Sequence, residues 1–295
     1  MRKVIKDFQA ETDGILVLKP SVVDEYYMSL ERASETKICL PTDFPELNKV
    51  LYGGLQPGVY VFGGNPGSGK TSFCLHLLET LALRKQHSIF FNLEMHQNQI
   101  VSKLLSGLSY RMNKKDKEFK KLTINDLYDM TMENMTDQQR KLLVTYRQRI
   151  EPYINIISLD RGTWQDSNPC NYVRSVGTAL RNYKKIHDIT PVVVIDFLQL
   201  LKDVAPTVEE DEPQIVYDKR LEMNEIIKTL KHYSNIHNAV IIVISSLSRS
   251  SYTSSNGDVE NSKVSMSCFK ETGEIEYRAD FCRSRALGSA PFMTL

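Results

Sequence analysis

The sequence contains the stretch Gly64-Asn65-Pro66-Gly67-Ser68-Gly69-Lys70-Thr71, which fills every fixed position of the phosphate-binding pattern G-x-x-x-x-G-K-[ST]. The glycines let successive backbone N–H groups turn toward phosphates, Lys70 reaches the terminal phosphates, and Thr71 offers its hydroxyl to Mg²⁺. Residues 58–63 are typical of a buried strand entering this loop. The helix that follows from Ser72 places its partial positive charge at the phosphates. The stretch predicts a nucleoside triphosphate site; a glycine-rich turn that binds nothing is the structural alternative.

Short apolar runs alternate with helical patterns along the rest of the chain. After the strand at 58–63, the runs typical of strands are 88–93, 154–159, 191–196 and 239–245. Amphipathic helical spacing occupies 171–187 and 220–235, among other segments. The near-continuous apolar run before Asp196 indicates a strand covered on both faces. This alternation predicts an α/β fold with a doubly wound, mainly parallel sheet and helices on both faces.

The chain is expected to form one main domain. Residues 1–40 mix short apolar patches with charge, and they are interpreted as an N-terminal arm or linker with one helix over 22–33. From residue 41 to 295 the pattern is that of a single ATPase-sized α/β domain. Two polar segments, 202–214 and 249–267, are interpreted as loops.

Amino-acid composition says more about the cellular compartment of the protein than about its binding partners. Lys and Arg total 37 against 36 Asp and Glu, so the net charge of +1 neither requires nor excludes nucleic acid. The five cysteines are odd in number and never spaced as C-x-x-C, which argues against a disulfide framework and a zinc site. The N-terminus has no apolar signal core, and no apolar run is long enough to cross a bilayer. We therefore expect a soluble, cytoplasmic protein without a membrane partner.

Two acids and two serines follow predicted strands, where the carboxyl ends of parallel strands line one crevice. Asp196 is the candidate for holding the Mg²⁺ shell, with a helix cap or surface acid as the alternative. Glu94 is the candidate general base, with a salt-bridged structural glutamate as the alternative. Ser245 and Ser246 end the last predicted strand, where either a γ-phosphate sensor or a simple hydroxyl cap fits.

The other charged residues and the histidines give weaker evidence of a functional site. The basic run from Arg111 to Lys121 could touch a phosphate backbone, but a solvated helix end or loop is the better interpretation. The six histidines show no metal-ligand spacing, and packed or surface roles fit each of them.

Four blocks, in this order, resemble the RecA-like ATPase domain of DnaB-type replicative helicases. The phosphate loop is general to many ATPases. Residues 90–95 (FFNLEM) are similar to that family's F-S-L-E-M block, and residues 194–201 (VIDFLQLL) to its I-D-Y-L-Q-L-M block. Residues 270–276 (KETGEIE), with Ala279-Asp280, resemble its R-E-S-G-A-I-E…A-D block. The resemblance covers roughly residues 41–281.

The resemblance implies a RecA-like P-loop core that couples ATP hydrolysis to movement on single-stranded DNA in replication. By it, Lys70, Thr71 and Asp196 bind ATP–Mg²⁺, and Glu94 activates water. It further implies a hexameric ring, with a helicase loader or a primase as candidate partners. Three residues would line a central channel holding the DNA: Lys270, Glu271 and Gly273.

The sequence departs from the family in ways that favour an alternative function. Ser246 stands where the family usually has a glutamine expected to sense the γ-phosphate. Only fifteen residues follow Asp280, so a C-terminally incomplete domain is expected, with Arg283 and Arg285 as weak substitutes for the family's basic pair that reaches a neighbouring subunit. The alternative is a RecA-like ATP-binding module that assembles or regulates replication or recombination without unwinding DNA.

Overall fold

The computed structural model describes residues 38–128, 130–158, 170–203, 219–246 and 279–285, together with the single position Val23. The chain divides into two units, Met1–Cys39 and Leu40–Leu295, and all the elements below lie in the second. The predicted helix at 22–33 and the loop at 249–267 lie outside the described residues, apart from Val23, as does most of the predicted loop at 202–214.

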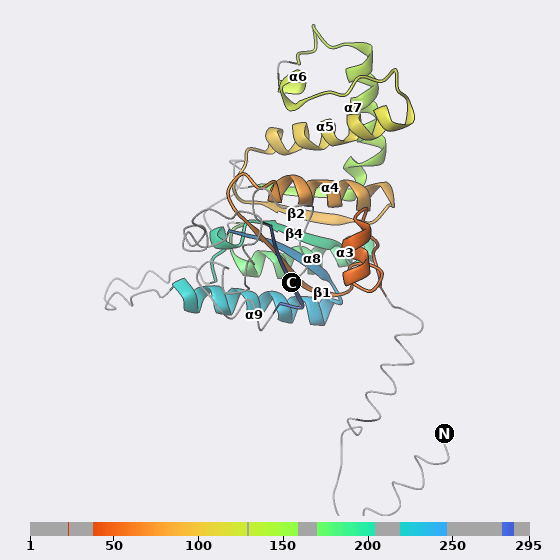
Figure 1. Ribbon diagram of the computed structural model, residues 1–295. Helices are drawn as coiled ribbons and strands as arrows, with labels where there is room; N and C mark the ends of the chain where they lie inside the picture. The colour runs from red at the N-terminus through yellow and green to blue at the C-terminus, as the bar shows by residue number, and fades with distance from the viewer. Residues whose placement is uncertain are drawn as a thin grey trace, which may run out of the picture. The chain divides into compact units, whose positions relative to one another are not determined.

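A parallel sheet organises the second unit (Figure 1). Its six described strands have the order β3-β2-β4-β5-β1-β6, and every described pair is parallel. The strands are β1 (Gly58–Gly64), β2 (Ser88–Asn92), β3 (Ile154–Ser158), β4 (Val192–Asp196), β5 (Val240–Ser246) and β6 (Phe281–Arg285). The sequence predicted the first five within two residues at each end, and it did not predict β6. Tertiary pairing defines β6, because it lies beside β1 at the sheet edge.

Helices cover both faces of the sheet, as Figure 1 shows. The predicted doubly wound α/β fold is therefore confirmed. One face carries α4 (Lys70–Leu83) and α5 (Gln97–Lys115), with α7 (Asp137–Arg149) packed on α5. The other carries α8 (Val173–His187) and α9 (Lys219–His237). The shorter helical elements are α3 (Pro45–Val50), α6 (Ile124–Tyr128), η1 (Glu151–Tyr153) and η2 (Leu198–Leu200).

Strand alternation explains why two hydrophobic cores form. In β1, Tyr60 and Phe62 face the core under α4, whereas Val59 and Val61 face the core under α8 and α9. All seven residues of β1 and all five of β4 are buried. A strand covered on both faces needs apolar side chains at every position, which is why β4 reads as an unbroken apolar run.

The polar region between the second and third predicted strands forms a helical layer. The run from Arg111 to Lys121 occupies the last turn of α5 and the loop after it, where most of its lysines are exposed. This agrees with a solvated helix end. Farther along, α7 begins with a capping box in which Thr136 and Gln139 satisfy each other's backbone N–H groups. The layer formed by α5, α6 and α7 packs on the outer side of α4, which contacts the sheet.

Candidate nucleotide site

The predicted phosphate loop joins β1 to α4. Gly64 ends β1, and α4 begins at Lys70, two residues earlier than the sequence predicted. Gly67 and Gly69 have φ values of 77° and 85°, which side chains other than glycine rarely adopt. A Cβ at Gly67 would meet nothing within 4 Å, so backbone conformation rather than crowding requires glycine there. The two left-handed glycines therefore give the loop its curl ahead of α4.

Lys70 bends back over the loop. Its Nζ donates to the carbonyl oxygens of Gly64 at 2.8 Å and of Asn65 at 2.9 Å. Burial lowers the pKa of Lys70, while the charges of Asp196 and Glu94 act in the opposite direction. The ammonium is thus held at the loop, within electrostatic reach of two carboxylates, and it supplies the positive charge that a phosphate would need.

Asp196 meets Thr71 across the site. Thr71 Oγ1 donates to Asp196 Oδ2 at 2.7 Å, which joins the first turn of α4 to the end of β4. Asp196 is only 1% exposed, and burial raises the pKa of its carboxyl group to about 6. Glu94 adds to this rise, while the Thr71 hydrogen bond and the charges of Lys70 and Lys103 oppose it. A buried carboxylate and a hydroxyl thus offer oxygen atoms at one point, as a hard divalent cation requires.

Ser68 supplies an independent observation that the loop fits an anion. Its Oγ is buried and has no hydrogen-bond partner among the described residues. A buried hydroxyl without a partner is costly, and a phosphate oxygen in the loop would accept its hydrogen bond. Together with the two left-handed glycines and Lys70, this arrangement fits a nucleotide phosphate chain.

Glu94 follows β2, the strand beside β4, and its side chain is exposed. The turn that carries it is fixed on both sides: Leu93 N donates to the Asp196 carbonyl at 2.9 Å, and Met95 N donates to Asn92 Oδ1 at 3.0 Å. Asn92 also reaches β3 through a 2.8 Å bond to Ser158 Oγ. Glu94 is therefore positioned on a rigid turn that faces solvent, while its charge acts on both Lys70 and Asp196.

The end of β5 is held by a glutamine. Gln199 Nε2 donates to Ser245 Oγ at 3.0 Å and to the Ser246 carbonyl at 3.5 Å, and Ser246 N donates to Gln199 Oε1 at 3.4 Å. Ser245 and Ser246 pair with Gly63 and Gly64 of β1, so they lie beside the start of the phosphate loop. Both the sensor and the capping interpretations of these serines remain open.

The residues predicted to contact DNA or a neighbouring subunit have no described side chains. Lys270, Glu271 and Gly273 lie outside the described residues. Arg283 and Arg285 lie on β6, where their backbones pair with Phe62 and Gly64, but their side chains are not described. Within the described ranges, no three His, Cys, Asp or Glu side chains form a metal-binding group, and no helix is long and apolar enough to cross a membrane.

Sequence reasoning missed three residues at the site. Lys103, on α5, acts on the Asp196 carboxyl group, and Asn92 and Gln199 fix the ends of β2 and β5. The local signals were the place of Asn92 and Gln199 beside predicted strand ends and, for Lys103, its match to a basic residue of the family after the F-S-L-E-M block. Their contacts are non-local, so no spacing pattern could assign them.

Comparison with known proteins gives a consistent result. Residues 39–283 match the family described as the DnaB-like helicase C terminal domain. The chain is 25% identical over 242 residues to the replicative DNA helicase DnaB of Geobacillus stearothermophilus, covering 82% of this chain and 45% of that protein. It is 26% identical over 241 residues to DnaB of Buchnera aphidicola subsp. Baizongia pistaciae, with 81% and 44% covered. The chain thus spans about half the length of these curated relatives.

Solved structures are similar in fold. A DnaB-like replicative helicase, studied with its interactions with primase, superposes with a TM-score of 0.64 at 19% identity, over 96% of this chain and 60% of that one. A second solved structure, described as an ATPase domain, superposes with a TM-score of 0.63 at 20% identity, over 90% of this chain and 84% of that one. At these identities the likeness concerns the fold alone.

Proposed function

The chain belongs to the family of DnaB-like helicase C-terminal domains, with a RecA-like core, and on this premise we propose that it hydrolyses ATP to translocate on single-stranded DNA during replication. The single observation that carries the proposal is the meeting of Lys70, Thr71 and Asp196 at a loop with an unpaired buried Ser68 hydroxyl. Positioning and electrostatic stabilisation are what phosphoryl transfer demands of a protein.

The phosphates of ATP would lie in the loop from Gly64 to Ser72. There the Ser68 hydroxyl and the curled backbone donate hydrogen bonds, and Lys70 leaves the Gly64 and Asn65 carbonyls for the phosphate oxygens. Thr71 and Asp196 would hold Mg²⁺, which supplies neutralisation of the charge that develops on the phosphates. Nucleotide binding would thereby relieve one cost of the free protein, the unpaired buried hydroxyl of Ser68.

Glu94 is the proposed general base. Its exposure leaves room for a water molecule, and the Leu93 bond to Asp196 fixes its turn relative to the β4 carboxylate. A carboxylate in this place can accept a proton from attacking water. Ser246 would report the γ-phosphate through the Gln199 amide that holds it.

The remaining roles follow from family membership. Lys270, Glu271 and Gly273 would contact the DNA backbone, which predicts salt-sensitive binding with little sequence preference. A hexameric ring, cytoplasmic location, and a helicase loader or primase as partner are proposed on the same ground. The interaction with primase is described for the similar solved structure.

ATP turnover with and without single-stranded DNA tests the proposal. A motor should show turnover that DNA stimulates, and the stimulation should weaken as salt rises. The oligomeric mass should be measured alongside with a non-hydrolysable ATP analogue, since a site shared between subunits needs the ring. A ring that hydrolyses ATP without responding to DNA would contradict translocation.

A second function is favoured by one observation. Ser246 has a side chain too short to replace a glutamine, and its backbone is already engaged by Gln199. This favours an ATP-binding assembly or regulatory module without unwinding activity. The same assay decides between the two, because such a module would bind ATP and assemble without DNA-stimulated turnover.

A further inference from the structure

An open pocket of about 390 Å³ lies among the ends of three helices, away from the phosphate loop. Leu83 closes α4, Lys115 closes α5, and Arg149 closes α7, and all three side chains line the pocket. Leu83 and His76 both lie on α4, which begins at Lys70, so at 1.5 Å per residue Leu83 is about 20 Å and His76 about 9 Å along the helix from the phosphate loop. The pocket is therefore a separate feature of the molecule.

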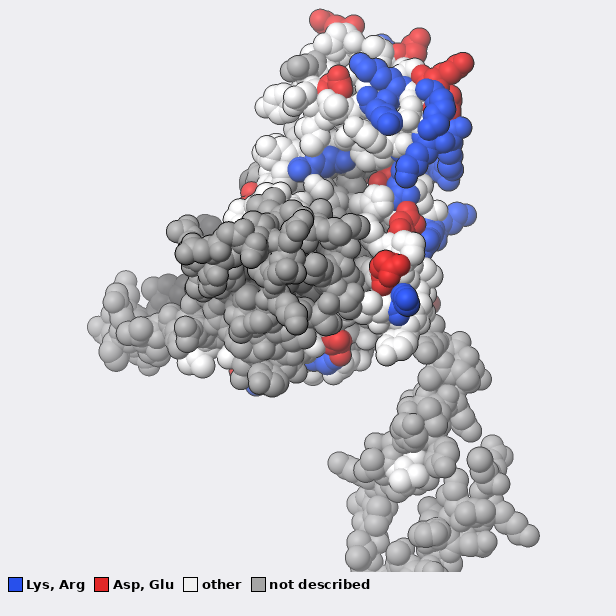
Figure 2. Space-filling view, viewed as in Figure 1, with Lys and Arg blue, Asp and Glu red and all other residues white. Residues whose placement is uncertain are grey.

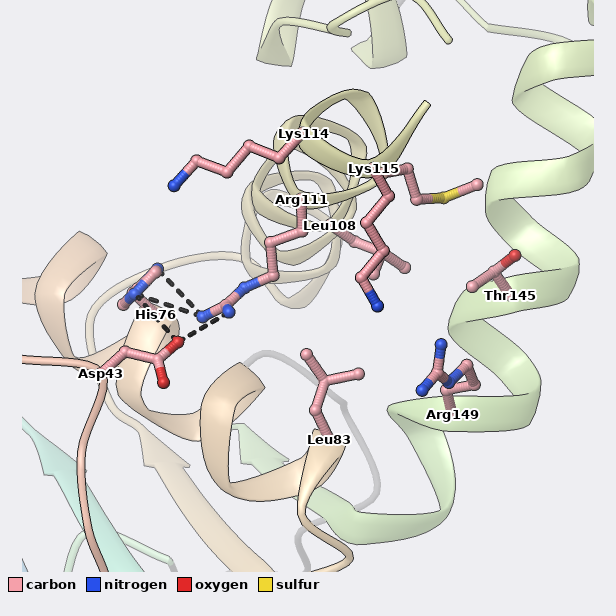
Figure 3. Close-up of a pocket in the computed structure, with 10 residues that line it drawn as sticks. Asp43, His76, Leu83, Leu108, Arg111, Lys114, Lys115, Thr145 and Arg149 are labelled. Carbon is pink, nitrogen blue, oxygen red and sulfur yellow. Dashed lines mark hydrogen bonds and ion pairs between the residues drawn. The ribbon is translucent and has the colours of Figure 1, made fainter. Parts of the chain in front are cut away.

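The rim of the pocket carries more positive charge than the nearby carboxylates neutralise. Arg111 is held by Asp43 at 2.7 Å and by the buried Glu79 at 3.0 Å. Lys114, Lys115 and Arg149 form no ion pair within the described part of the chain. Figure 3 shows Lys115 extending from α5 and Arg149 from α7 into the space between the two helices, near Leu83. In Figure 2, Lys and Arg side chains gather over this helical layer.

Neutralisation of helix ends does not account for this charge. Each helix C-terminus carries about half a negative charge, so three ends supply about −1.5 against the three cationic side chains. The environment of His76 points the same way. Burial lowers its pKa, and the charges of Arg111 and Lys114 lower it further, while Asp43 alone opposes them. A positive potential thus remains over the pocket.

The floor of the pocket is apolar. Leu108 is 3% exposed, and Leu83 and Met112 are partly buried against the same hydrophobic core. No residue in the first turn of a described helix lines the pocket, so the helix N-terminal N–H groups that usually bind phosphate are absent from its described lining. Long cationic side chains around an aliphatic floor instead suit carboxylates on either side of an apolar side chain.

We propose that this pocket docks an acidic peptide segment of a partner protein, with one apolar side chain on Leu83, Leu108 and Met112 and its carboxylates between Lys115 and Arg149. Charge complementarity carries the choice of occupant. Such a contact raises the association rate and weakens with salt, whereas the apolar anchor supplies the part of the affinity that salt does not screen.

The test uses the full chain and a short fluorescein-labelled peptide of glutamate and leucine, read by fluorescence polarisation. Arg149→Glu should weaken binding about tenfold. Arg147→Glu is the matched control, because Arg147 is exposed, lies in the same last turn of α7 and does not line the pocket. Both variants cost the helix end alike, so a thermal melt separates folding from binding. If Arg149→Glu does not fold, Arg149→Ala and Arg147→Ala give the same comparison.

Two further arms define the occupant. A peptide with serine in place of leucine should bind more weakly, and Leu83→Gln should affect the leucine peptide more than the serine peptide. Inorganic tripolyphosphate is tested on a Lys70→Ala background to remove the phosphate loop. Equal peptide binding by Arg149→Glu and Arg147→Glu, or no peptide binding at all, overturns the proposal. The proposal is also overturned if tripolyphosphate binds in a way that depends on Arg149 and the peptide does not bind.

Discussion

Thr71 Oγ1 donates a 2.7 Å hydrogen bond to Asp196 Oδ2, joining two residues 125 positions apart. One follows the phosphate loop and the other ends β4, so the contact brings the two predicted halves of a metal site together. Burial raises the pKa of Asp196 to about 6, and this hydrogen bond opposes the rise. In the proposed site, Mg²⁺ would take the place of this hydrogen bond and would be held by the same two side chains.

Thr71→Val should remove the advantage that Mg²⁺ gives to nucleotide binding. The hydroxyl is lost while the shape is kept, so metal-free nucleotide should bind nearly as in the wild type. Affinity for a fluorescent ATP analogue, measured with and without Mg²⁺, should show the Mg²⁺ advantage reduced about tenfold. Thr178→Val, the same change on α8 away from the phosphate loop, is the control. An unchanged Mg²⁺ advantage in Thr71→Val would remove this residue from the metal site.

Lys70→Ala should weaken nucleotide binding about 100-fold or more, because the loop loses its charge-assisted bonds to the phosphates. The same fluorescent analogue measures it. Lys117→Ala removes an equal charge from an exposed loop and should bind as the wild type does. Comparable losses in both variants would mean that bulk charge, rather than the loop, attracts the nucleotide.

Glu94→Gln should preserve binding and lower ATP turnover by about 10²–10⁴-fold, since an amide cannot accept the proton of water. The turn should remain intact, because its bonds come from Leu93, Met95 and Asn92 rather than from the Glu94 side chain. Steady-state turnover at saturating ATP is the measurement. Wild-type turnover in the variant would assign Glu94 a structural role.

Glu79 should make stability depend on pH. It is 1% exposed on α4, and burial raises its pKa from 4.5 to about 7, although Arg111 on α5 acts to lower it and Asp43 adds to the rise. The folded state therefore binds the proton more tightly than the unfolded state does. Its contribution is fully present below pH 4.5 and is lost as pH rises through 7.

Glu79→Gln cannot titrate and should lack this loss. Between about pH 5 and 8, the free energy of unfolding of the wild type should fall by roughly 2 kcal/mol more than that of the variant. Urea unfolding across this range measures the difference. Parallel pH profiles for the two proteins would show that Arg111 offsets the effect of burial, so that the pKa of Glu79 is the same in the folded and unfolded states.

Gly54→Ala should destabilise the fold by about 1–3 kcal/mol. A Cβ at this position would lie 2.4 Å from the Leu40 carbonyl oxygen, a backbone atom that cannot rotate away. The neighbouring bridge between Leu40 and Leu55, with bonds of 2.8 and 2.9 Å, would have to shift. Thermal unfolding is the measurement, with the exposed Lys49→Ala as control. Equal stability of the two variants would show that the bridge moves freely.

Local patterns were enough to predict much of the fold and of the candidate site. The first five strands and both sheet faces follow from apolar runs, Lys70 and Thr71 from the phosphate-loop pattern, and Glu94 and Asp196 from acids at the ends of strands. The strand β6 was missed because its few apolar residues gain their place only by pairing with β1. The basic run at the end of α5 was correctly interpreted as a solvated helix end, but its meeting with Arg149 was not visible in the sequence.

The sequence by itself determined that a phosphate loop lies between a buried strand and a helix, and that acids end the neighbouring strands. These are local properties of backbone conformation and side-chain burial. Only the tertiary structure decided which groups meet: Thr71 with Asp196, Gln199 with Ser246, and Arg111 with Glu79. The physical reason is that strand order and helix packing bring together residues far apart in the chain, and a hydrogen bond or ion pair depends on their separation in space.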